Sequence, residues 1–108
     1  MINKTVHEGK SIAIIAYFWW IGLVIALIMN NSKKNSFASF HIRQVIGLLL
    51  LSLAMTLVYK YAGETIGYIL SMGVFVLWVI GLIGAFNGEE KKIPLLGDQF
   101  QEWFKSIS

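Results

Sequence analysis

The sequence predicts an all-α membrane protein with three transmembrane helices and a short C-terminal amphipathic helix at the membrane interface. Apolar residues make up 56% of the 108 residues and charged residues only 14%, whereas soluble domains contain about half and about a quarter. Long apolar runs alternate with short polar segments, and a chain of this length has too small an interior to bury them all. The alternative is a soluble oligomer that buries apolar helices against copies of itself.

We expect a single membrane domain over residues 1–108, with its first helix at about 11–29. The run from Ile12 to Met29 carries no charge, and as a helix it would nearly cross a hydrocarbon core of about 30 Å. A cleaved signal peptide is the alternative, but the run exceeds the usual apolar core of ~7–15 residues, and no small-residue cleavage pattern follows it. The aromatic block 17–20 predicts packing against other helices, or a cavity wall with a Trp N–H group facing a polar partner.

The second helix is expected at about 37–60, after a polar loop in which Asn35 or Ser36 can cap its first turn. The third helix is expected at about 65–86, because residues 66–86 carry no charge and Asn87-Gly88 suits a helix end. Small residues four apart would let the helices approach closely. These expected packing positions are Gly22, Ala26, Gly63, Gly67, Ser71, Gly81 and Ala85.

A polar cluster at the start of the second helix provides the candidate interaction residues. They are Phe40, His41, Arg43 and Gln44. Ionisable residues at membrane depth are costly and indicate function by default, although a long Arg43 side chain near the interface can reach lipid phosphate. His41 and Gln44 could face inward, toward the third helix or the segment around Pro94, or could lie at the lipid headgroups. Facing inward, they would hold the fold together or contact a partner.

The C-terminal segment from about 98 to 107 has the pattern of an amphipathic helix. Phe100, Trp103 and Phe104 fall on one side of it, and polar residues fill the other. An apolar face that carries Trp predicts a place in the membrane interface. A docking site for a partner protein is the alternative.

The distribution of Lys and Arg predicts an orientation. With three spans, the N-terminus and second turn would lie on one side, with Lys4, Lys10 and Lys60, and the other six Lys and Arg residues would lie on the opposite side. Positive charge is enriched in cytoplasmic loops. The N-terminus is therefore expected outside, and the first loop and C-terminus in the cytoplasm.

Several classes of chemistry find no support in the sequence. The chain has no Cys, and the three-span topology would put its two His residues, His7 and His41, on opposite sides, so neither a thiolate site nor a His metal site is expected. No acidic residue lies near His41 in the sequence to complete a Ser–His–acid set. We therefore expect no catalytic residues, no metal and no cofactor. The net charge of +3 is spread along the chain and does not suggest a nucleic-acid partner.

Two short segments carry a resemblance to a known family. They are Phe40-His41-Ile42-Arg43-Gln44, followed by an apolar helix, and Ala85-Phe86-Asn87-Gly88-Glu89, with Pro94 shortly after. Over residues 10–97 the chain resembles small bacterial membrane proteins of unknown function, which are distantly similar to the Tic-type subunit of the chloroplast inner-envelope import machinery. The resemblance implies a helical bundle in a bacterial inner membrane and a role near protein translocation or insertion.

These features predict a binding or accessory subunit of a membrane complex, in contact with the lipid bilayer and with other membrane subunits or further copies of itself. An oligomeric transporter or channel component is the alternative from a different class. Conduction needs polar residues along the spans, and few are present, chiefly Gln44, Ser52, Thr56 and Ser71.

Overall fold

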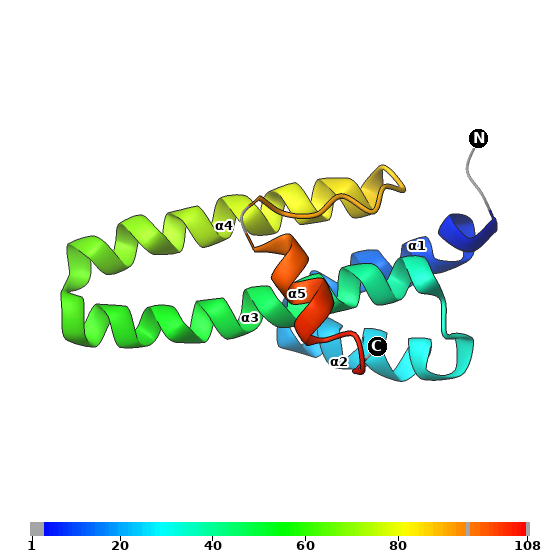
Figure 1. Ribbon diagram of the computed structural model, residues 1–108, viewed down its shortest axis with the longest axis horizontal. Helices are drawn as coiled ribbons and strands as arrows, with labels where there is room; N and C mark the ends of the chain where they lie inside the picture. Colours follow the sequence, from blue (N-terminus) through cyan, green and yellow to red (C-terminus); the bar gives the residue numbers. More distant parts are fainter. Residues whose placement is uncertain (1–3, 95, 108) are drawn as a thin grey trace.

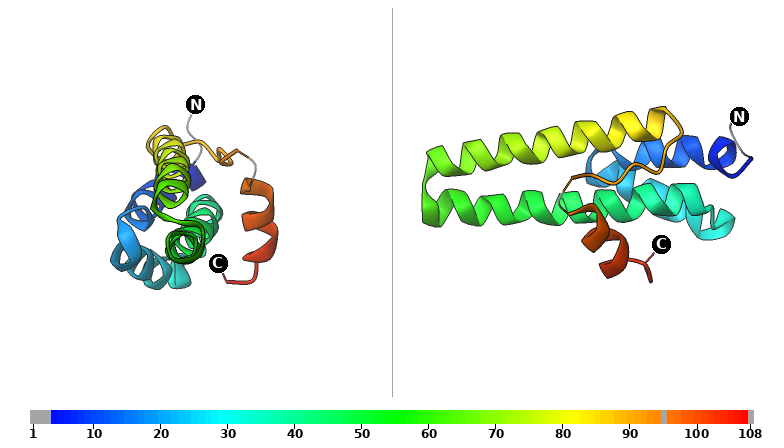
Figure 2. Two further views of the ribbon diagram at one scale, coloured as in Figure 1. Left: turned by 90° about the vertical axis from the view of Figure 1, so that its left-hand side faces the viewer. Right: turned by 45° about the horizontal axis from the view of Figure 1, so that its top comes forward.

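Two helical hairpins of different length make up most of the molecule (Figure 1). The computed structural model describes residues 4–94 and 96–107. The helices in this part of the chain are α1 (Lys4–Ala16), α2 (Trp19–Lys33), α3 (Ser36–Ala62), α4 (Glu64–Phe86) and α5 (Gly97–Trp103). The long helices α3 and α4 run antiparallel, and the shorter α1–α2 hairpin packs beside the first half of α3. Viewed along the bundle, α5 lies on the opposite flank of α3 from α1 and α2 (Figure 2).

Among the described residues, two helices rather than three are long and apolar enough to cross a membrane. They are α3, with 27 residues, and α4, with 23, which correspond to about 40 Å and 35 Å at 1.5 Å per residue. The expected first span at about 11–29 is wrong, because the chain reverses at Tyr17 and Phe18 and continues as α2. The all-helical class holds, with α1 and α2 in place of one spanning helix.

The reversal in this apolar run is a tight turn with hydrogen bonds of its own. The Tyr17 and Phe18 amides donate to carbonyls three residues back at 3.1 and 3.0 Å, which closes α1. Trp19 then adopts a φ of 64°, a left-handed conformation that redirects the chain into α2. Gly22 lets the new helix approach closely, since a Cβ there would lie 2.2 Å from the Ile15 carbonyl oxygen.

Because of this reversal, the start of α1 and the loop after α2 lie at the same end of the molecule. The Asn35 side-chain amide donates to the Thr5 carbonyl at 2.8 Å, and Gly88, after α4, lies against Val6. We call this the proximal end, and the turn at Gly63 the distal end. The start of α1 and the first loop therefore lie at one end of the molecule, rather than at the two ends of a single spanning helix.

The start of α3 is built on an asparagine pair. The Asn35 Oδ1 accepts from the Ala38 amide at 3.0 Å, which caps the helix. The Asn30 side chain accepts from the Asn35 amide at 2.9 Å and donates to the Ser39 hydroxyl at 2.9 Å. Asn30, Asn35 and Ser39 are all buried, so these bonds satisfy polar groups that water does not reach.

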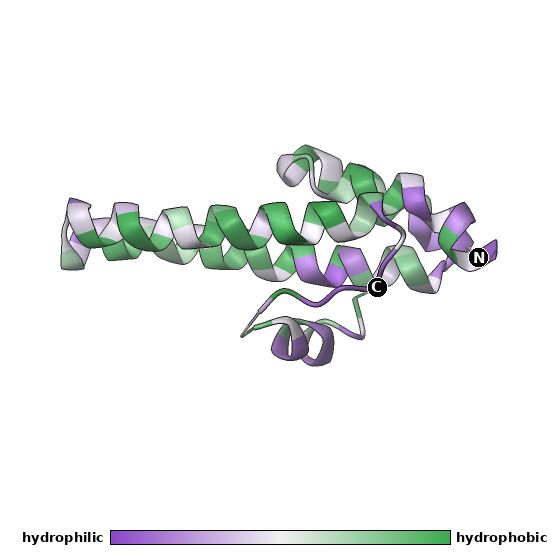
Figure 3. Cartoon of the chain, turned by 90° about the horizontal axis from the view of Figure 1, so that it is seen from above, coloured by the Kyte–Doolittle hydropathy of each residue, from purple (hydrophilic) through white to green (hydrophobic). Residues whose placement is uncertain are grey.

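The core of the molecule occupies its proximal half, where α1, α2, α3 and α4 meet. Its largest fully buried side chains include Ile12, Tyr17, Phe37 and Ile42. The distal half of the α3–α4 hairpin consists mostly of apolar residues (Figure 3), and many of them are exposed. Large exposed side chains there include Leu53, Leu57, Ile66, Ile69, Met72 and Phe75.

Candidate functional site

Two of the candidate interaction residues of α3, His41 and Gln44, lie in a buried hydrogen-bonded network that also includes Tyr17, from the turn between α1 and α2. His41 and Gln44 have no exposed surface. The Tyr17 hydroxyl lies 2.7 Å from the His41 Nδ1, and the Gln44 Nε2 donates to the same hydroxyl at 3.0 Å. The His41 Nε2 lies 2.8 Å from the Glu89 carbonyl oxygen.

These partners determine how protons are arranged in the network. A carbonyl oxygen can only accept, so the His41 Nε2 carries the hydrogen that bonds to Glu89. In the neutral imidazole the Nδ1 is then an acceptor, and the Tyr17 hydroxyl donates to it while accepting from Gln44. Each hydrogen is used once, and the network needs no net charge, which suits a buried site.

Aromatic rings enclose the His41 imidazole. Phe37, Phe40 and Tyr17 all meet it edge-on, with ring centroids 4.9, 5.1 and 5.6 Å away. Phe40 is itself 6% exposed. The imidazole is therefore surrounded by apolar rings and has two polar partners, the Tyr17 hydroxyl and the Glu89 carbonyl. Such an environment suits a residue that holds other segments in position.

The same network holds the chain after α4. The Gln44 Oε1 accepts from the Ile93 amide at 2.9 Å, and the Gln44 Nε2 also donates to the Lys91 carbonyl at 3.3 Å. The stretch 89–93 has no helical or strand structure, so its backbone groups need such partners. The two segments that carry the family resemblance, 40–44 and 85–94, are thus in direct contact.

Helix α4 contacts the network through Trp78 and Gly81. Trp78 donates its indole N–H to the Tyr17 carbonyl at 2.9 Å, a carbonyl that the end of α1 leaves available. Gly81 makes room for the network, since a Cβ there would lie 2.8 Å from the Tyr17 hydroxyl and 3.1 Å from the Gln44 Nε2. Glycine at this position therefore allows α4 to approach α1 and α3.

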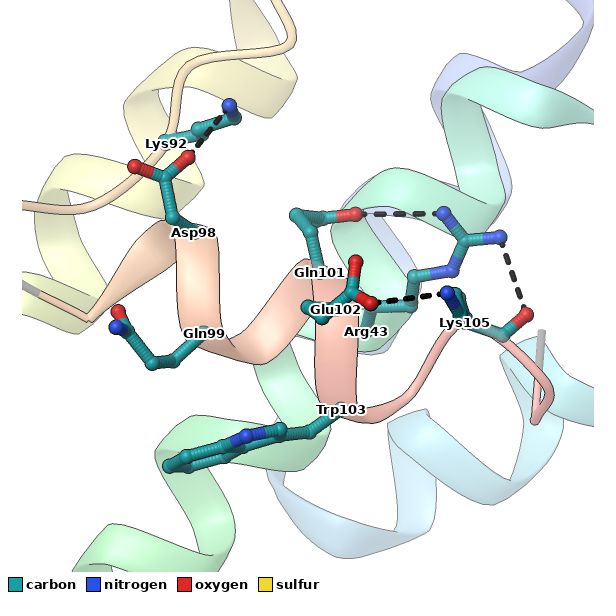
Figure 4. Close-up of a pocket in the computed structure, with 8 residues that line it drawn as sticks. All are labelled: Arg43, Lys92, Asp98, Gln99, Gln101, Glu102, Trp103 and Lys105. Atoms are coloured by element: carbon teal, nitrogen blue, oxygen red, sulfur yellow. Dashed lines mark hydrogen bonds and ion pairs between the residues drawn. The ribbon is translucent and has the colours of Figure 1, made fainter.

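Arg43 points away from this network, toward α5 (Figure 4). Its Nη1 and Nη2 donate to the Gln101 Oε1 and the Lys105 carbonyl, both at 3.4 Å, which is longer than the usual range of about 2.7–3.2 Å. The Gln101 Nε2 in turn donates to the Phe40 carbonyl at 2.8 Å. Arg43 and Gln101 therefore join α5 to the start of α3.

The apolar side of α5 is divided between the protein and its surroundings. Phe100 is buried, and it sits where a Cβ on Gly47 would be, 2.2 Å from the Phe100 Cγ. Phe104 packs at the edge of the core, while Trp103 is 64% exposed. The helix ends at Trp103, earlier than the expected 107. Part of the expected interfacial face is therefore used to dock α5 on α3.

The expected packing residues lie in different settings. Gly22, Ala26, Gly67, Gly81 and Ala85 are buried, Ser71 is half-buried, and Gly63 is exposed at the distal turn. Gly67 lies against the Tyr59 ring, where a Cβ would be 2.8 Å from it. Gly63 has a φ of 101°, so it serves the turn between α3 and α4 by its conformation.

The network members outside α3 are absent from the candidate residues that the sequence suggested. In the sequence Tyr17 and Trp78 are simply aromatic residues within apolar runs, and the amide of Ile93 has no side-chain signal at all. The aromatic block at 17–20 provides one hint, because a Trp N–H group that faces a polar partner is one of the alternatives there. In the structure the Trp that makes such a bond is Trp78, which lies outside the block. No cluster of His, Asp and Glu suited to a metal occurs among the described residues.

No protein-family model matches the chain, and no solved structure matches it. The chain is 30% identical over 94 residues to the UPF0132 membrane protein MJ1527 of Methanocaldococcus jannaschii, an alignment that covers 83% of this chain and 64% of the relative. It is 29% identical over 73 residues to the UPF0132 membrane protein MJ1443 of the same archaeon, which covers 66% of each. The chain thus spans just under two thirds of the length of both relatives.

These similarities agree with the apolar helices in indicating a membrane protein. Both relatives are archaeal, so they lend no support to a bacterial source. Neither is described as a Tic-type or protein-transport component, and the link to translocation stays a hypothesis.

Proposed function

We propose that this membrane protein is a non-enzymatic binding or accessory subunit of a membrane complex, which contacts other transmembrane helices through the distal half of the α3–α4 hairpin. We call residues 50–76 the distal finger. The observation that carries the proposal is its outer surface, where large apolar side chains such as Leu53, Ile69 and Phe75 are about 60% exposed on both helices. Such a surface suits contact with lipid and van der Waals packing against the helices of another subunit. In the proximal half, α1 and α2 cover the corresponding surface of α3.

The buried network supports a structural role for the α3 motif rather than a catalytic one. Both ring nitrogens of His41, the Tyr17 hydroxyl and the Gln44 amide are engaged with protein groups. A general base needs access to a substrate proton at hydrogen-bond distance, and His41 is fully buried among aromatic rings.

The α1–α2 hairpin is well suited to enter the bilayer only part of the way. The stretch from Trp19 to Met29 is about 16 Å long as a helix, roughly half of a hydrocarbon core of about 30 Å, and Trp20, Val24 and Ile28 are exposed along it. Irregular backbone at membrane depth is tolerated where it is buried in protein. At the turn between α1 and α2, the Trp78 indole donates to the Tyr17 carbonyl and so satisfies a backbone group that the helix leaves unpaired.

Charge supports a definite orientation for this arrangement. Lys60 lies near the distal turn, and the other eight of the nine Lys and Arg residues belong to proximal segments. The positive-inside rule then places the proximal end, with the start of α1 and with α5, in the cytoplasm and the distal turn across the membrane. The cytoplasmic membrane fits this asymmetry.

Crosslinking from single cysteines tests the proposal, because the natural chain has no Cys. Ile69→Cys and Val76→Cys sit on the distal finger with 62% and 54% exposure, and Ile28→Cys on α2, at 69%, is the matched control. In native membranes, a short thiol-reactive crosslinker should join the two finger positions to one foreign protein at near-equal stoichiometry. Crosslinking that is equally strong from Ile28→Cys, or absent from both finger positions, would refute the assignment.

The same experiment separates the subunit from an oligomeric channel. Crosslinks between identical chains, together with conductance in liposomes, would establish the channel instead. The structure gives limited support for conduction, because two polar side chains of the finger, Ser52 and Thr56, bond to their own helix. The Ser52 hydroxyl donates to the Leu48 carbonyl at 3.0 Å and the Thr56 hydroxyl to the Leu53 carbonyl at 2.6 Å.

A role near protein translocation rests on the resemblance of residues 40–44 and 85–94 to small bacterial membrane proteins that are distantly similar to the Tic-type subunit. In this chain the two segments meet at Gln44. The expected result is that depletion of the protein delays membrane insertion of a reporter protein, and that the wild-type chain restores it. Normal insertion kinetics after complete depletion would remove this specific role and leave the subunit proposal intact.

A further inference from the structure

We propose that a polar hollow at the proximal end binds a phosphate group, carried by the headgroup of an anionic phospholipid. The hollow has a volume of about 410 Å³ and lies where the end of α2, the start of α3 and the chain after α5 converge. It is distinct from the distal finger, and it does not depend on any protein partner.

The chemistry of the hollow matches a phosphate. Lys34 and Arg43 both line it, and hydroxyl groups come from Ser36, Ser39 and Ser106. No Asp or Glu is among the described residues that line it. Two cations with nearby hydroxyl donors favour a group with negative charge and several acceptor oxygens.

The two cations come from segments that the fold brings together, the loop after α2 and the start of α3. The Lys34 backbone is in a left-handed conformation with φ 48°, and its amide donates to the Asn30 carbonyl at 2.7 Å. The Arg43 guanidinium reaches Gln101 and the Lys105 carbonyl by bonds of 3.4 Å.

The contrast with the neighbouring hollow strengthens the assignment. The hollow drawn in Figure 4 shares Arg43 but contains Asp98 and Glu102, which pair with Lys92 at 2.6 Å and with Lys105 at 2.9 Å. The charges of Lys92 and Lys105 are therefore compensated within the protein. Among the described residues, the lining of the hollow at Lys34 contains no acidic residue of this kind.

Apolar residues in the same hollow explain why the phosphate would belong to a lipid. Leu27, one turn before Asn31 on α2, and Ile107, after α5, line it together with the polar groups. A headgroup at Lys34 and Arg43 would place its acyl chains beside Leu27 and along the exposed apolar surface of α2. Anionic lipids attract basic residues at the cytoplasmic surface of a membrane in the same way.

Binding of short-chain lipids to the detergent-solubilised full chain tests the inference. The probes are dioctanoyl phosphatidylglycerol, dioctanoylglycerol, which lacks the phosphate, and inorganic phosphate. Lys34→Gln should weaken phosphatidylglycerol binding about fivefold, the effect expected for one basic residue near an anionic headgroup. The matched control is Lys33→Gln, which removes the same charge from the adjacent exposed position and should change binding less than twofold.

Each outcome has a definite meaning. Tighter binding of phosphatidylglycerol than of the other two probes, with a loss confined to Lys34→Gln, supports the lipid site. Equal binding of inorganic phosphate would assign the hollow to free phosphate and overturn the lipid source. Equal binding of dioctanoylglycerol, or equal losses in the two lysine variants, would overturn the phosphate site itself. Lys34→Arg should retain binding, which controls for folding.

Discussion

Replacing Gln44 by Leu is the sharpest test of the buried network. The side chains have similar volume, so the change removes polar bonds with little change in packing. Gln44 donates to Tyr17 at 3.0 Å and to the Lys91 carbonyl at 3.3 Å, and it accepts from the Ile93 amide at 2.9 Å. Hydrogen bonds within membrane bundles contribute about 0.6 kcal/mol each on average, and a buried N–H group left unsatisfied costs about 1–3 kcal/mol. We expect the free energy of unfolding to fall by about 2–3 kcal/mol.

Reversible unfolding in mixed micelles of mild and denaturing detergent can measure this change through the fluorescence of the chain's four Trp residues. Gln99→Leu is the matched control, since it makes the same chemical change at an exposed position of α5, where substitutions usually change stability by less than about 0.5 kcal/mol. A second readout reports the local effect. A Cys at Ile93, which is 2% exposed, should react slowly with a maleimide in the parent chain and much faster when Gln44→Leu is added.

One result would refute the reasoning about the network. Suppose that the free energy of unfolding of Gln44→Leu lies within about 0.5 kcal/mol of the parent value and that Ile93→Cys stays protected from the maleimide. Gln44 then does not hold the segment after α4. A large loss of stability with unchanged labelling would place the effect elsewhere in the bundle and would equally contradict the proposed role of Gln44.

Three further predictions follow from the same contacts. Tyr17→Phe, which removes the hydroxyl shared by His41 and Gln44, should lower the free energy of unfolding by about 1–2 kcal/mol; an unchanged value in the same detergent assay would contradict the bonding scheme. Gly47→Ala should displace Phe100 and speed tryptic release of the C-terminal segment, whereas Gly73→Ala, which has no neighbour within 4 Å, should not; equal rates would show that the contact is unimportant. Compartment-specific reporters at the two termini should both be active in the cytoplasm, and activity on opposite sides would restore the three-span topology.

Patterns that are local in the sequence predict much of this fold. The apolar stretches of α3 and α4, the cap at Asn35 and the turn at Gly63 all depend on residues within a few positions of one another, and each has a simple physical cause. The candidate site is only partly local. His41 and Gln44 stand out as polar residues at the start of an apolar helix, but their partners, such as Tyr17 and the Ile93 amide, are 24 and 49 positions away. Nothing in a single sequence links these positions, because the contact depends on how the hairpins pack.

The break between α1 and α2 shows why tertiary structure overrode the sequence pattern. No Pro or Gly interrupts residues 12–21, so the run has the composition of one continuous helix. The left-handed conformation of Trp19 costs about 1–2 kcal/mol. Tyr17 offsets this cost with three tertiary hydrogen bonds, to His41, Gln44 and Trp78, which a straight helix could not align in the same way. The polar residues of α3 therefore do more than join helices, since they stabilise the turn that changes a spanning helix into a hairpin and brings the N-terminal segment to the proximal end.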